Sequence, residues 1–266
     1  MRLSETSAST AAFFRVAYAL PVLLMLWLPA RKKDSRSFRQ RAGAFLAGVV
    51  LGVDLVAWHH AIDAIGAGVA TVLGNTQVFF VALAAWWLYG ERPRKVILWV
   101  LPLMFAGVIL ASGLGRADAY GAAPSDGVLL GLATGVLYSI FLLVFRRSAP
   151  SDGLPIGPWL DATVGTLASV WLLSLYNGDL NLTWVWPAHG WLIALALIAQ
   201  VFGWLLITKS LRKMPAIETS VLLLAQPVLT LTWGWILLGE RLSSIQIGGT
   251  LLVLLGIGLL SIPRNR

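Results

Sequence analysis

Long apolar runs separated by short polar connectors dominate the chain. A helix needs about 20 mostly apolar residues to cross the hydrocarbon core of a bilayer. Because backbone groups inside lipid must hydrogen-bond within their own segment, runs of this length predict helices rather than strands. Nine candidate spans result, at residues 11–28, 42–61, 67–89, 96–114, 127–145, 157–176, 190–208, 215–238 and 245–262. The predicted fold class is therefore all-α, a polytopic membrane protein with nine transmembrane helices.

Lys and Arg residues gather in alternate connectors. Sixteen lie in the odd-numbered connectors and the C-terminal end, against three or four in the even-numbered connectors and the N-terminal end. Since cytoplasmic connectors carry the excess of Lys and Arg, residues 263–266 are predicted to form a cytoplasmic tail and the N-terminus to lie outside. The expected location is the plasma (inner) membrane, crossed several times.

Composition supports a membrane location and narrows the partners. The chain is 58% apolar and 12% charged, with a mean hydropathy of +0.80, whereas a soluble domain carries about 25% charged residues. Lipid and a small-molecule substrate are the expected partners of a monomer or homodimer. The net charge of +8 lies in the connectors, so topology explains it and no nucleic-acid partner is expected. With no Cys, three His and no P-loop, neither a metal site nor a cofactor is predicted.

Two segments of the chain are related by an internal repeat. A shift of 149 residues superimposes residues 66–113 on 215–262 with 13 identities in 48 positions and no gap. Uncommon residues fall in register, namely Gly90-Glu91-Arg92 on Gly239-Glu240-Arg241, Gln77 on Gln226 and Gly107 on Gly256. Chance matches of Leu, Val and Ala do not account for these pairs, so the repeat indicates a duplication.

The predicted topology places the two Gly-Glu-Arg connectors on opposite sides of the membrane. The two halves are therefore inverted relative to each other. Residues 1–114 form a first half of four helices, and residues 127–262 form a second half of five. Inverted repeats recur in secondary transporters, where the halves exchange conformations and open a central site to each side in turn. The pattern thus predicts a secondary transporter.

The helix–Gly-Glu-Arg–helix pattern of each half, together with Phe14-Arg15 followed by Ala17 and Ala19, resembles the EamA-type bacterial members of the drug/metabolite transporter superfamily. The resemblance implies ten helices in two halves of five, both termini in the cytoplasm, and export or exchange of small polar metabolites such as amino acids. The sequence departs from that pattern because no helix precedes residue 11. The first half is expected to be one helix short, which indicates either a start downstream of the true one or a shortened variant.

Polar side chains near the middle of the spans are candidate substrate ligands, because a polar group in lipid costs free energy unless it has a partner. The candidate substrate-binding residues are Asp54, Trp58, Asn75, Gln77, Tyr138, Gln200, Trp204 and Gln226. As repeat mates, Gln77 and Gln226 are expected to face each other at the midplane, where substrate sites of inverted-repeat transporters lie. Bonding to a neighbouring helix is the alternative role for any one of these residues.

Other residues suggest structural roles. Pro227 removes an intrahelical hydrogen bond and is a candidate hinge or pivot. The two Gly-Glu-Arg copies are expected to set tight turns between helices. Asp161, early in its span, is a candidate partner of Arg15. Runs of small residues, Gly43, Ala47, Gly48 and Gly52 and also Gly131 and Gly135, predict close contact between helices.

Two alternative functions remain. An integral membrane enzyme of the prenyl or acyl transferase type would need paired acidic clusters at the membrane face, whereas the acidic residues in the cytoplasmic connectors are isolated. A non-transporting membrane assembly factor would need no polar residues at the midplane. The polar set therefore favours the transporter.

Overall fold

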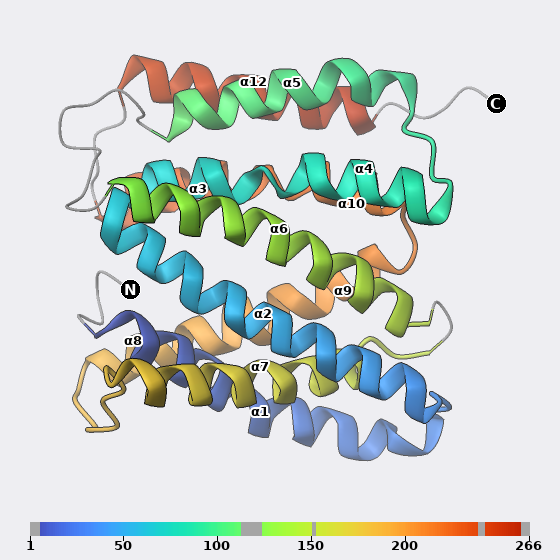
Figure 1. Cartoon of the computed structure of the whole chain (residues 1–266), viewed down its shortest axis with the longest axis vertical. Coiled ribbons are helices and arrows are strands. Elements are labelled where there is room, and N and C mark those ends of the chain that lie inside the picture. Colours follow the sequence, from blue (N-terminus) through green and yellow to red (C-terminus); the bar gives the residue numbers. More distant parts are fainter. Residues whose placement is uncertain (1–5, 113–123, 151–152, 239–242, 262–266) are drawn as a thin grey trace. The chain divides into compact units, whose positions relative to one another are not determined.

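The computed structural model describes residues 6–112, 124–150, 153–238 and 243–261, and the regular structure in those ranges is helical throughout (Figure 1). The all-α prediction is confirmed. Six helical segments, some made of consecutive helical elements, are long and apolar enough to cross a membrane, at Ser9–Lys33, Phe38–Ile65, Gly68–Tyr89, Ser125–Ser148, Ile156–Asn177 and Ala188–Leu211. Shorter apolar helices lie at Lys95–Ala111, Ala216–Leu229 and Ser244–Leu259, where the other three spans are predicted. The number of nine spans stays a prediction.

The chain divides into two compact units, with boundaries within α2 (Phe38–Ile65), within α6 (Pro124–Ser148) and after Met214. Unit 1 comprises residues 1–59 and 137–214, and unit 2 comprises residues 60–136 and 215–266. Each unit thus takes helices from both predicted halves.

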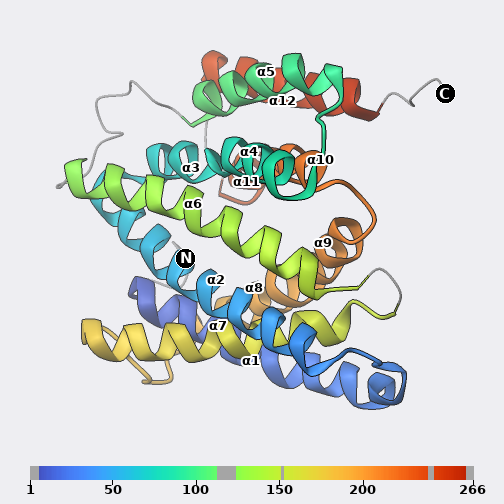
Figure 2. The same ribbon diagram turned by 45° about the vertical axis from the view of Figure 1, so that its right-hand side comes forward.

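Unit 1 is built around α1 and α7, which lie side by side (Figure 2). Its elements, besides the parts of α2 and α6, are α1 (Ala8–Ala30), the 3-10 turn η1 (Arg31–Lys33), α7 (Ile156–Asn177), α8 (Ala188–Leu195), the π-helix η2 (Ala196–Gly203) and α9 (Trp204–Leu211). A capping box starts α2, since Ser37 N–H donates to Gln40 Oε1 at 2.9 Å and Gln40 N–H donates to Ser37 Oγ at 3.3 Å.

Small residues bring α2 and α7 into backbone contact. A Cβ added to Gly48 would overlap the backbone of Ala162, and one added to Gly165 would overlap the backbone of Phe45. Thr166 Oγ1 donates to the Gly48 carbonyl at 3.0 Å across this contact. The prediction of close packing at the small-residue run is confirmed here, and the absence of side chains is its physical cause.

Unit 2 contains two interrupted helices and one long helix pair. Its elements, besides the parts of α2 and α6, are α3 (Ala67–Asn75), α4 (Gln77–Tyr89), α5 (Lys95–Ala111), α10 (Ala216–Leu222), α11 (Ala225–Leu238) and α12 (Ser244–Ser261). The predicted continuous spans 67–89 and 215–238 are each broken, after Asn75 and after Leu222. A shift of 149 residues places Thr76, at the first break, on Ala225, where α11 resumes.

Local hydrogen bonds account for both interruptions. At the first, Thr76 Oγ1 donates to the Leu73 carbonyl at 2.5 Å and competes with the backbone ladder. At the second, Pro227 has no N–H and so cannot donate the usual helical hydrogen bond to the carbonyl of Leu223, four residues earlier. That carbonyl accepts instead from Gln226 N–H at 3.0 Å. Sequence hydropathy alone does not detect these breaks because the residues around them remain apolar.

The helices α5 and α12 pack along each other in a reciprocal way (Figure 1). A Cβ added to Gly107 would lie 2.9 Å from Val253 Cγ2, and one added to Gly256 would overlap the side chain of Met104. The shift of 149 residues converts the first contact into the second, since it carries Gly107 to Gly256 and Met104 to Val253. The repeat is therefore expressed in unit 2 as a local pseudo-two-fold contact.

Candidate functional site

A cluster of polar and aromatic side chains gathers inside unit 1, and we name it the Arg15 cluster. Its members are Arg15 on α1, Asp54 on α2, Tyr138 on α6, Trp159 on α7, Gln200 on η2 and Trp204 on α9. The sequence predicted four of these as site residues, namely Asp54, Tyr138, Gln200 and Trp204. It did not predict Arg15 and Trp159 as site residues.

Gln200 is the centre of the cluster's hydrogen bonds. Its side chain is fully buried, and its Oε1 accepts from Arg15 Nε at 2.9 Å. Its backbone carbonyl accepts from the indole N–H of Trp159 at 2.7 Å. Gln200 lies within the π-helical segment η2, where the usual ladder of backbone hydrogen bonds is altered, and such segments are frequent at functional sites. The Trp159 indole thus satisfies a carbonyl in an irregular part of the backbone.

Aromatic rings form one wall of the cluster. The rings of Trp159 and Trp204 are stacked, with centroids 4.5 Å apart and planes inclined by 13°. The Tyr138 ring lies 6.3 Å from that of Trp204, and the Phe141 ring meets Trp204 edge-on at 5.2 Å. Trp204 thus packs among three aromatic side chains. Tyr138 remains partly exposed while Trp159 is fully buried.

Two buried polar atoms of the Arg15 cluster have no hydrogen-bond partner among the described residues. They are Asp54 Oδ1 and Gln200 Nε2. Asp54 is only 4% exposed. It interacts electrostatically with Arg15 and Tyr138, but no ion pair joins it to Arg15. Folded proteins rarely leave buried polar atoms unpaired. Such atoms therefore indicate a place where another polar group, from water or a ligand, completes the set.

The eight predicted substrate-binding residues are divided between the two units. Five of them belong to unit 1, namely Asp54, Trp58, Tyr138, Gln200 and Trp204. The Trp58 ring meets that of His59 edge-on. Asn75, Gln77 and Gln226 belong to unit 2 and flank the helix interruptions. Gln77 is 2% exposed, and its Nε2 donates to the Ser220 carbonyl at 3.4 Å.

The two remaining amides have different surroundings. Asn75 Nδ2 donates to the Thr71 carbonyl of its own helix at 2.8 Å. Gln226 is exposed in the first turn of α11. The expectation that Gln77 and Gln226 face each other as substrate ligands stays a prediction.

The first Gly-Glu-Arg copy ends one helix and caps another. Gly90 closes α4 in the left-handed conformation, with φ of 65°. The carboxylate of Glu91 then accepts from the backbone N–H of Ala216, at the start of α10, at 3.0 Å. An acidic group at a helix N-terminus satisfies an orphan N–H and favours the helix dipole. Arg92 is exposed. The second copy, Gly239-Glu240-Arg241, lies outside the described residues.

Pro227 lies in the first turn of α11, directly after the second interruption. A proline is tolerated in a first helical turn because the N–H groups there have no intrahelical acceptor. Its position agrees with a pivot, and the hinge motion itself stays a prediction.

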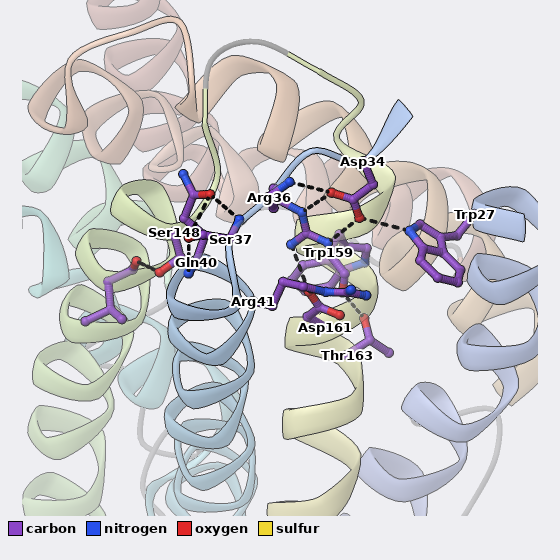
Figure 3. A network of polar contacts seen from close by, with 11 residues as sticks. Trp27, Asp34, Arg36, Ser37, Gln40, Arg41, Ser148, Trp159, Asp161 and Thr163 are labelled. Atoms are coloured by element: carbon purple, nitrogen blue, oxygen red, sulfur yellow. Dashed lines mark hydrogen bonds and ion pairs between the residues drawn. The ribbon is translucent and has the colours of Figure 1, made fainter. Parts of the chain in front are cut away.

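A second polar group in unit 1, which we name the Arg36 network, lies at the junction of η1, α2 and α7 (Figure 3). Arg36 stands between two carboxylates, with Nε 2.8 Å from Asp34 Oδ1 and Nη1 2.8 Å from Asp161 Oδ2. Arg41 lies 3.6 Å from the same Asp161 oxygen. The Trp27 indole donates to Asp34 Oδ2 at 3.1 Å. Hydrogen bonds from Arg36 hold the pKa of Asp34 well below its usual range.

The predicted pairing of Asp161 with Arg15 is wrong. Asp161 pairs with Arg36 and Arg41, whereas Arg15 donates to Gln200. Arg36 and Arg41 belong to the sixteen Lys and Arg residues that predict the topology, and the sequence assigned them no partner. Arg15 carried a detectable signal, because it is a charged residue inside an apolar run. Trp159 carried none, since thirteen Trp residues occur in the chain and most suit an interfacial role equally well.

Comparison with known proteins identifies relatives over most of the chain. The threonine/homoserine exporter RhtA of Escherichia coli (strain K12) is 26% identical over 236 residues, covering 88% of this chain and 75% of the relative. An uncharacterized transporter of Archaeoglobus fulgidus is 29% identical over 203 residues, covering 73% of this chain and 67% of the relative. An uncharacterized transporter of Synechocystis is 26% identical and is covered over 64% of its length.

The fold also matches a known crystal structure. That structure superimposes with a TM-score of 0.77 at 16% sequence identity, covering 97% of this chain and 88% of the other, which establishes a shared fold. Residues 1–113 and 125–262 match the EamA-like transporter family. These matches extend over both segments of the internal repeat. The chain is therefore a multi-pass membrane protein that belongs to the EamA-like transporter family.

Proposed function

We propose that the protein is a secondary transporter that exports or exchanges small polar metabolites, such as amino acids, by alternating access of two inverted halves. The observation that carries this proposal is the repeat as it stands in unit 2, with helix interruptions at corresponding positions and the reciprocal contacts of Gly107 and Gly256. In inverted-repeat transporters, interrupted helices at corresponding positions accompany the substrate site. A cytoplasmic C-terminus in the inner membrane is part of the same proposal.

The relatives support the choice of substrate class. A protein named as a threonine/homoserine exporter is similar over 88% of this chain, so L-threonine and L-homoserine are the first solutes to test. Family membership also favours transport over the membrane-enzyme and assembly-factor alternatives.

Counterflow in proteoliposomes tests the transport function. Vesicles containing the purified protein are loaded with unlabelled L-threonine or L-homoserine and diluted into buffer that holds a trace of the labelled solute. We expect transient, saturable accumulation of label that empty vesicles do not show. If folded protein gives no counterflow of any solute in a panel of amino acids, amines and carboxylates, the proposed function is wrong.

A single introduced cysteine tests alternating access. The chain contains no Cys, so Asn75→Cys places a unique thiol beside the first helix interruption. We expect membrane-impermeant maleimides to label it from either face, with a ratio that changes when a transported solute is added. Gly258→Cys is the control for an effect of solute on labelling. Nothing lies within 4 Å of an added Cβ at this exposed position, so solute should not change its labelling. Labelling of Asn75→Cys from one face alone, unaffected by solute, would contradict alternating access.

A further inference from the structure

We propose that Arg15 and Asp54 form a two-point recognition site for a zwitterionic amino acid, in which Arg15 binds the carboxylate and Asp54 binds the ammonium group. This inference rests on the transport function proposed above and specifies how its substrate is recognised.

Arg15 has donors available for a carboxylate. Its Nε is held by Gln200 Oε1 at 2.9 Å, which fixes the plane of the guanidinium group. The terminal nitrogens make no hydrogen bond to the described residues, and the side chain is partly exposed. A guanidinium group presents five N–H donors in a planar fork that matches a carboxylate in a bidentate geometry. Gln200 therefore acts as a positioning residue for Arg15.

Asp54 has an acceptor available for an ammonium group. Asp54 is 4% exposed and lies within α2, one of the helices long enough to cross a membrane. Its Oδ1 has no hydrogen-bond partner in the part of the chain that the structure describes. A carboxylate at membrane depth is costly unless a partner compensates its charge. A substrate ammonium group would supply both the opposite charge and the missing donor.

The absence of an ion pair between Arg15 and Asp54 distinguishes this site from a simple internal salt bridge. The two groups interact electrostatically, but no ion pair joins them among the described residues. In the same unit, Arg36 contacts both of its carboxylate partners at 2.8 Å. Unpaired opposite charges that lie near each other suit a ligand that carries both charges on neighbouring atoms. An α-amino acid is the simplest such ligand.

The aromatic wall of the cluster completes the chemistry. The Tyr138 and Trp204 rings lie 6.3 Å apart, and Tyr138 also interacts electrostatically with Asp54. Aromatic faces attract an ammonium group and pack against the carbon atoms of a side chain. The rings contribute contact area, while the two charges determine which class of ligand binds.

Two analogues of threonine test each charge separately. Threoninol carries a hydroxymethyl group in place of the carboxylate, and the hydroxy-acid analogue carries a hydroxyl in place of the ammonium group. In the parent protein, L-threonine should compete with labelled L-threonine roughly 10- to 100-fold better than either analogue, as expected for one charged hydrogen-bonding partner. Equal competition by the analogues would overturn the inference without any variant.

Variants then assign each charge to its residue. Asp54→Asn should abolish the preference for L-threonine over the hydroxy acid and keep the preference over threoninol. Arg15→Gln should do the reverse. Asp63→Asn is the matched control, since Asp63 is an exposed acidic residue on the same helix as Asp54, and it should change neither preference.

The possible failures are distinguishable. If the parent shows counterflow but Asp54→Asn and Arg15→Gln weaken threonine and both analogues in parallel, the two residues have a structural role and the inference is wrong, while the transport function stands. If the parent shows no counterflow of any solute, the proposed function fails first. Because the analogue competition uses the parent protein, a variant that does not fold leaves that test intact.

Discussion

The two polar groups of unit 1 differ in how completely their charges are paired. In the Arg36 network, the guanidinium of Arg36 lies 2.8 Å from both Asp34 and Asp161. In the Arg15 cluster, Asp54 has no such contact, and one buried oxygen of its carboxyl group lacks a partner among the described residues. Ion-paired charges hold helix ends together, whereas a buried carboxylate without an ion pair suits a further charged partner. The difference supports a structural role for the first group and the ligand-binding role that we propose for the second.

The largest expected effect follows from removing the central cation of the Arg36 network. Arg36→Met leaves Asp34 and Asp161 without their main partner, and breaking a buried ion pair in this way costs about 3–5 kcal/mol. Unfolding of the purified protein in detergent measures the loss. Arg39→Met is the control, since Arg39 is exposed one turn further along. The remaining folded protein should keep its preference for L-threonine over the analogues. A loss below about 1 kcal/mol would remove the contrast between the two groups.

A smaller effect is expected within the Arg15 cluster from Trp159→Phe. The variant keeps an aromatic ring but removes the indole N–H that the Gln200 carbonyl accepts at 2.7 Å. An unsatisfied buried acceptor costs about 1–3 kcal/mol. Because Gln200 positions Arg15, the apparent affinity for threonine should also fall. Trp171→Phe is the control, since Trp171 lies on the same helix and is 49% exposed, and it should lower the affinity less. Unchanged affinity with lowered stability would make Trp159 a purely structural residue.

Particular residues show what the sequence could and could not predict. Helix positions were predictable because hydrophobic length is a local property of the chain. The interruption at Thr76 was not, because it depends on one side-chain hydrogen bond within an apolar run. The interruption at Leu223 had a signal in the sequence, since Pro227 removes a backbone hydrogen bond there. Gln200 was detectable as an amide in the middle of a span. Its partner Arg15 was not assignable, since the two are 185 residues apart and their meeting depends on how α1 packs against η2.

The pH dependence of stability should differ between the parent and Asp34→Asn. Arg36 holds the folded-state pKa of Asp34 below the unfolded value of about 3.9. The charged form therefore stabilises the fold above about pH 4, and this contribution is lost as the pH falls toward the folded-state pKa. Between pH 6 and pH 3, the parent should lose roughly 1 kcal/mol relative to Asp34→Asn. Parallel stability profiles for the parent and Asp34→Asn would show that Arg36 does not lower the folded-state pKa of Asp34.

The smallest effect is expected from Arg41→Gln, which tests whether burial or charge defines the Arg36 network. Arg41 lies 3.6 Å from Asp161, but its side chain is 44% exposed, against 4% for Arg36. Exposed ion pairs contribute about 0–1 kcal/mol because water and salt screen them. Unfolding in detergent should therefore show a change below about 1 kcal/mol that shrinks further at high salt. If Arg41→Gln instead matches Arg36→Met, the number of cations around Asp161 governs stability rather than their burial. Complete pairing would then no longer separate the Arg36 network from the Arg15 cluster, and the selectivity of Arg15 and Asp54 variants would be the only basis for distinguishing them.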